Sequence, residues 1–156
     1  MNDDERLYIG ENARELERMR GLVERLTADD LRKQVNEFWT VAGVLGHIAF
    51  WDGRALALAD KLERALESDQ QHPFSSVDEE PEDVDWINDA SRPLIHAVPP
   101  QELAKLALAI AEQTDSKITT LPPEHLWPRD RDSPLNAFRA SHRGEHLNDI
   151  EAALGR

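Results

Sequence analysis

The 156-residue sequence contains no cysteine. This absence excludes a disulfide, a thiolate metal ligand and a cysteine nucleophile belonging to the protein itself. Any reaction at sulfur would therefore have to use a thiol from another molecule.

Proline is missing from the first 72 residues, and all nine prolines lie at or after Pro73. The first half of the chain can therefore form long uninterrupted helices, while the second half is divided by helix-breaking residues. No segment alternates apolar and polar residues between turn residues, which is the pattern of a half-buried strand. These features predict an all-α protein.

Basic residues are few, with 18 Lys and Arg against 31 Asp and Glu, which gives a formal net charge of −13. This balance argues against a nucleic-acid partner, because phosphate contacts need clustered basic side chains. The longest uncharged run, Phe38 to Trp51, has 14 residues, whereas a bilayer span needs about 20. The chain begins MNDDE, which is acidic where a secretory signal would be basic. We therefore expect one cytoplasmic domain over residues 1–156, with no membrane partner.

Apolar residues recur at helical spacing in four long segments, at about residues 3–26, 40–67, 101–121 and 134–154. Thr40 is the expected N-cap of the second helix, and Ser133-Pro134 is the expected start of the fourth. The predicted fold is a four-helix bundle with one long crossover connection between the second and third helices. Within that connection we expect a short helix over residues 84–90, anchored by Trp86 and Ile87.

Three of the six histidines replace apolar residues on predicted core stripes. His142 and His146 are four residues apart, so both project from one face of the last helix. His47 lies between Val44 and Trp51 on the stripe of the second helix. If these two helices are neighbours, three imidazoles could bind one metal ion and leave a coordination position open. The alternative is that each is an ordinary core histidine with a hydrogen-bond partner, since the spacing alone is weak evidence.

Simpler interpretations apply to the other residues near these positions. We expect Trp39 and Trp51 to be packing residues close to the site. Glu145 is about 100° around the helix from His146, so we do not expect it to be a ligand. Asp149 is either a hydrogen-bond acceptor for the site or a solvated side chain. The remaining histidines are expected on the surface; they are His72, His96 and His125.

Three segments together resemble the DinB-like (YfiT-type) family, which includes the metal-binding domain of mycothiol-dependent maleylpyruvate isomerase. Residues 39–48 read WTVAGVLGHI, residues 83–88 read DVDWIN, and residues 142–150 read HRGEHLNDI. The resemblance covers nearly the whole chain. One departure is Arg143-Gly144-Glu145, where the family often has an aromatic or basic residue. A glycine inside a helix costs about 1 kcal/mol relative to alanine, so Gly144 indicates either close backbone approach or room for a ligand.

The resemblance implies a homodimeric four-helix bundle in which His47, His142 and His146 bind a divalent metal, with zinc or nickel expected first. It also implies a stress-response enzyme, a metal-dependent transferase or isomerase that uses a low-molecular-weight thiol on a small electrophilic substrate. The metal would lower the pKa of that thiol. The alternative is a non-catalytic helical binding module with an empty or structural histidine site. DNA binding, suggested by the family's historical name, is opposed by the net charge of −13.

Overall fold

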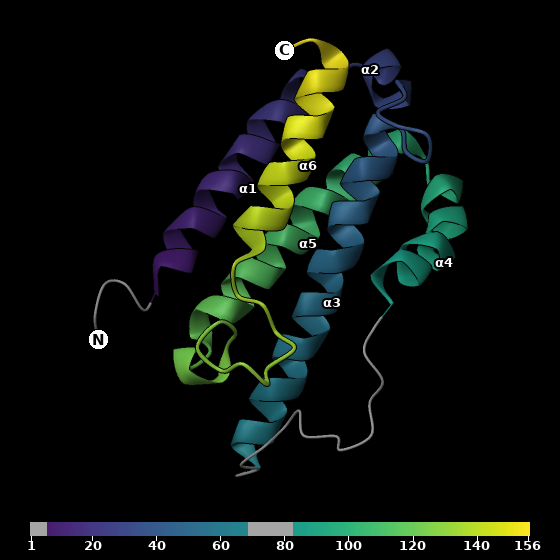
Figure 1. Cartoon of the computed structure of the whole chain (residues 1–156). Helices are drawn as coiled ribbons and strands as arrows, with labels where there is room; N and C mark the ends of the chain where they lie inside the picture. The colour runs from purple at the N-terminus through teal and green to yellow at the C-terminus, as the bar shows by residue number, and fades with distance from the viewer. Residues whose placement is uncertain (1–5, 69–82) are drawn as a thin grey trace.

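The structure, a computed structural model, describes residues 6–68 and 83–156, and over these ranges the chain is all-helical (Figure 1). Two isolated β-bridges are the only strand-like pairings in the described ranges. The predicted class is therefore confirmed. The helices, in chain order, are α1 (Leu7–Arg25), α2 (Ala28–Arg32), α3 (Val41–Glu67), α4 (Val84–Ala97), α5 (Pro100–Thr120), the short 3-10 helix η2 (Pro123–His125) and α6 (Arg139–Leu154).

The four longest helices, α1, α3, α5 and α6, lie side by side (Figure 1). Helix α3 contacts both α5 and α6, and α1 contacts the same two helices. Helix α4 lies against α3, and α2 packs against α3 and α5. The contact between α3 and α6 brings together the two helices that carry the candidate histidines. No helix in the described ranges is long and apolar enough to cross a bilayer.

Two helix starts follow from local capping residues. The side chain of Thr40 accepts a hydrogen bond from the backbone N–H of Gly43, which confirms the predicted N-cap of α3. Thr27 and Asp30 form a reciprocal capping box at the start of α2. These hydrogen bonds satisfy backbone donors that have no partner within the helix.

The predicted start of the last helix at Ser133-Pro134 is wrong, because α6 begins at Arg139. The side chain of Asn12 in α1 donates to the carbonyl of Ala137 and accepts from the backbone N–H of Ala140. A buried side chain from another helix thus performs the capping role. A contact of this kind, more than 120 residues away in the sequence, has no local signal.

The short helix expected over residues 84–90 is longer, and one of its anchors is wrong. Helix α4 continues through Pro93 to Ala97, and its buried residues are Ser91 and Ile95. Trp86 is 75% exposed, while Ile87 is partly buried. His72 lies among residues 69–82, outside the described residues.

The contact between α3 and its neighbours depends on Gly46. A Cβ at this position would lie 2.6 Å from Cγ2 of Ile95 and 2.8 Å from Cδ2 of Leu103. Both distances are shorter than carbon atoms tolerate. The missing side chain therefore lets α4 and α5 approach α3 one turn from its N-terminal end, next to His47.

Candidate metal centre

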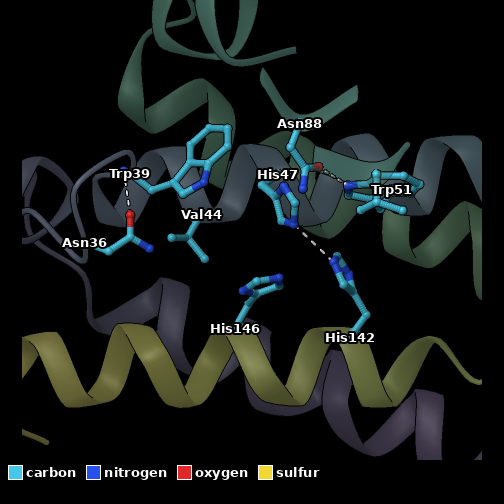
Figure 2. Close-up of a pocket in the computed structure, with 9 residues that line it drawn as sticks. Asn36, Trp39, Val44, His47, Trp51, Asn88, His142 and His146 are labelled. Carbon is cyan, nitrogen blue, oxygen red and sulfur yellow. Dashed lines mark hydrogen bonds between the residues drawn. The ribbon is translucent and has the colours of Figure 1, made fainter. Parts of the chain in front are cut away.

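The structure brings together the three histidines that the sequence singled out. His47 projects from α3, and His142 and His146 project from consecutive turns of α6 (Figure 2). One ring nitrogen from each of the three lies within 4.8 Å of the other two. The Nε2 atoms of His47 and His142 are 3.2 Å apart. Three imidazoles thus surround one point, as a metal ion requires.

The separation of the two Nε2 atoms fits a shared metal ion. Two nitrogens that each lie 2.0–2.1 Å from a tetrahedral zinc are about 3.3 Å from one another. A hydrogen bond between the rings would also fit this distance, with one ring donating to the other. In either case the Nδ1 atoms of His47 and His142 are buried and have no hydrogen-bond partner among the described residues. Burial of such groups is costly, and a metal bound through the two Nε2 atoms would not supply the missing partners.

Burial keeps two of the rings neutral. Desolvation, with a smaller contribution from the neighbouring His146, lowers the pKa of His47 to about 4. Desolvation also lowers the pKa of His142 to about 2, with added repulsion from His146 and Arg139. Both imidazoles are therefore uncharged at neutral pH, which is the state that binds a metal ion.

The third ring has a carboxylate beside it. Nδ1 of His146 lies 3.3 Å from Oδ2 of Asp149, one turn further along α6. A histidine that donates through Nδ1 to a carboxylate presents Nε2 to a metal, in the arrangement common at metal sites. Of the two interpretations of Asp149, acceptor or solvated side chain, the structure supports the acceptor, although half of its side chain remains exposed.

A buried charge network, which sequence analysis missed, lies behind the histidines. Asp52 of α3 is fully buried and accepts a 2.8 Å hydrogen bond from Nε of Arg139 and another from Nε of Arg143. The guanidinium of Arg143 also donates to both carboxylate oxygens of Asp115 in α5. Two arginines thus face two carboxylates, so the charges balance. The network joins α6 to α3 and α5 beside His142. In the sequence it could have been recognised from Arg139 and Arg143, which lie on the same helical stripe as the histidines.

The histidines line a cavity of about 420 Å³, a size typical of small-molecule sites. Trp39 and Trp51 form part of its wall, with ring centroids 5.5 and 6.5 Å from that of His47. The expectation that both tryptophans pack close to the site is confirmed. Nε1 of Trp51 donates a 2.9 Å hydrogen bond to Oδ1 of Asn88 in α4, a residue that sequence analysis named only as the end of the DVDWIN segment. The described lining residues are Asn36, Trp39, Val44, His47, Trp51, Val84, Asn88, His142 and His146.

The remaining candidates lie outside the cluster. His96 is exposed on α4, with its ring edge against Trp39, and His125 belongs to η2. Glu145 is exposed and is not among the clustered residues, as expected. A Cβ at Gly144 would lie 3.4 Å from the carboxylate of Glu15 in α1. This is an ordinary van der Waals distance, so the approach of α1 does not by itself require a glycine here.

Comparison with known proteins assigns the chain to a family. The family model of the DinB superfamily matches residues 11–150, which is most of the sequence. The chain therefore belongs to the DinB superfamily. No curated protein and no solved structure matches it at the significance required. The class is thus an all-helical DinB-superfamily protein with a three-histidine cluster that could hold a metal ion.

Proposed function

We propose that His47, His142 and His146 bind one divalent metal ion, and that the chain is a metal-dependent transferase or isomerase acting on a small electrophile. The observation that carries this proposal is the convergence of three ring nitrogens within 4.8 Å of one another at a cavity of about 420 Å³. We further propose that residues 1–156 act as one domain, and that α1, α3, α5 and α6 form the four-helix bundle that the resemblance implies.

The donor set favours zinc or nickel. Three neutral imidazoles suit borderline divalent ions, and a site with three protein ligands leaves a position for an exchangeable ligand. When bound, such an ion would act as a Lewis acid and lower the pKa of a coordinated low-molecular-weight thiol. The absence of cysteine is consistent with a thiol supplied from outside the chain.

The roles of the chain's own residues follow from their contacts. Asp149 orients the ring of His146 through its Nδ1. The network around Asp52 holds Arg139 and Arg143, and with them the α6 turn that carries His142. Trp39 and Trp51 shield one side of the cavity from water. Relation to the maleylpyruvate isomerase domain and a homodimeric state remain predictions, and light scattering on purified protein tests the latter.

Metal analysis of tag-free protein by mass spectrometry tests the proposal. We expect about one zinc or nickel per chain in the wild type and loss of metal in His47→Ala and His142→Ala. The matched control is His125→Ala, which changes a histidine of η2 outside the cluster and should retain the metal. Metal in the wild type would justify a screen of thiols with electrophiles.

A non-catalytic binding module is the competing function. Absence of metal from the wild type, even after reconstitution with zinc or nickel, would contradict the enzyme proposal and favour this alternative. A bound metal that admits no external ligand would favour a structural site, because catalytic sites keep an exchangeable position.

A further inference from the structure

The side-chain amide of Asn88 has a defined orientation at the cavity. Nε1 of Trp51 donates to Oδ1 of Asn88 at 2.9 Å. An indole N–H can only donate, so the amide oxygen must face Trp51 and the amide nitrogen must lie on the other side. Figure 2 shows this nitrogen on the side toward His47. Across residues 6–68 and 83–156, no hydrogen-bond acceptor is found for it.

Both residues of this pair are held by the surrounding helices. Trp51 follows His47 by four residues on α3, so the indole and the imidazole share one face of a rigid helix. Asn88 is partly buried on α4, whose Ile95 packs against Gly46 of α3. The two N–H groups of Asn88 are thus donors in a fixed place beside the histidines. Donors that are positioned before a ligand arrives lose little entropy on binding.

The rest of the cavity wall limits what can bind. Trp39, Val44 and Val84 provide apolar surface, and no Lys, Arg, Asp or Glu is among the described lining residues. A cationic ligand would therefore find no counter-charge there, and an anionic ligand would find none besides a bound metal ion. A flat apolar group can lie along this wall, and an oxygen attached to it can accept from Asn88.

We propose that Asn88 is the specificity-determining residue of the cavity and selects ligands in which a carbonyl or carboxylate oxygen adjoins a flat apolar group. Nδ2 of Asn88 donates to that oxygen, and Trp51 sets the orientation of the amide. The inference deepens the proposed function, because it assigns the ligand class of the same histidine site.

Asn36 is the other amide in the cavity wall and makes a matched control. Its Oδ1 accepts from the backbone N–H groups of Phe38 and Trp39, so its nitrogen is also left as a donor. Asn36, however, is exposed, and in Figure 2 it lies beyond Trp39, away from Trp51. Asn36 is thus more exposed to solvent than Asn88, and hydrogen bonds from its N–H groups should add less to binding.

The test is a titration of zinc-loaded protein with benzoate, benzamide or benzylamine, in which 15N–1H correlation spectra monitor binding. Benzoate and benzamide should shift the Asn88 side-chain N–H signals and the Trp51 indole signal, whereas benzylamine should not.

Asn88→Asp keeps an acceptor for Trp51 but removes both donors. We expect it to weaken benzoate binding about tenfold or more and to reverse the preference in favour of benzamide, whose amide can donate. Asn36→Asp carries the same added charge and should weaken benzoate binding by less than about threefold.

Three results of these titrations would decide between the assignment of Asn88 and its alternatives. Equal losses in Asn88→Asp and Asn36→Asp would mean that charge alone matters and would overturn the assignment of Asn88. Absence of benzoate and benzamide binding to metal-loaded wild type would overturn it too. If the wild type takes up no metal, the proposed function fails, and benzamide titration of the metal-free protein then tests Asn88 independently. Shifts of the Asn88 signals there would sustain the inference, and their absence would overturn it.

Discussion

Nδ1 of His146 lies 3.3 Å from Oδ2 of Asp149, three residues further along the same helix. This pair connects the candidate metal site to a carboxylate outside it. Because the two residues are three apart on one helix, their side chains are neighbours whenever α6 is folded. The relationship has a direct consequence for metal affinity.

Asp149→Asn should weaken zinc binding about 10- to 100-fold, because the carboxylate orients His146 and makes its ring a better ligand. Competition with a chromophoric chelator measures the affinity. Glu145→Gln is the matched control, since it removes one negative charge from the same helix at an exposed position outside the cluster. Equal affinities for both variants would show that Asp149 does not support the site.

Asp52→Asn should lower the free energy of unfolding by about 3 kcal/mol or more, because it leaves two buried arginines with one carboxylate. Urea unfolding followed by circular dichroism measures the change. The control is Glu11→Gln, which removes a surface ion pair with Arg14 and should cost less than about 1 kcal/mol. A loss in Asp52→Asn no larger than in the control would contradict a buried network.

Gly46→Ala should destabilise the protein by up to about 2 kcal/mol. The added Cβ would overlap Ile95 and Leu103, and the overpacking costs about 1–3 kcal/mol, of which the gain in helix propensity offsets about 1 kcal/mol. Gly10→Ala has the opposite expected sign, because nothing lies within 4 Å of its Cβ. It should stabilise α1 by about 0.5–1 kcal/mol. Thermal unfolding measures the stability of both variants. If both substitutions stabilise the protein, close packing at Gly46 is refuted.

The metal-free protein should lose stability as the pH falls below about 6.5. The pKa values of His47 and His142 are lowered to about 4 and about 2 in the folded protein, so the unfolded chain binds protons that the folded chain does not. At pH 5 His142 accounts for a loss of at most about 2 kcal/mol, since pH 5 is roughly 1.5 units below the ordinary value. Urea unfolding at pH 7 and pH 5 measures the loss.

His142→Asn should reduce this pH dependence, whatever its effect on stability at pH 7, because it removes one of the two groups. His125→Asn leaves the cluster intact and should keep the wild-type dependence. If the free energy of unfolding of His142→Asn falls between pH 7 and pH 5 by as much as that of the wild type, His142 is not held as a neutral imidazole in the folded chain.

Local pattern was sufficient for much of the fold and for the three histidines. The helical class, the cap at Thr40 and the inward positions of His47, His142 and His146 all follow from residue spacing, because helical periodicity places residues on one face irrespective of what they pack against. The family resemblance agreed with these residues and is confirmed by the superfamily match.

Tertiary contacts determined the start of α6 and the buried polar pairs. Asn12 of α1 determines where α6 begins, overriding the local signal at Ser133-Pro134. The Trp51–Asn88 hydrogen bond and the Asp52–Arg143 pair join residues 37 and 91 positions apart. Such pairs have no signature in a single sequence, because polar side chains are ordinarily solvated, and only helix packing determines which of them are buried against one another.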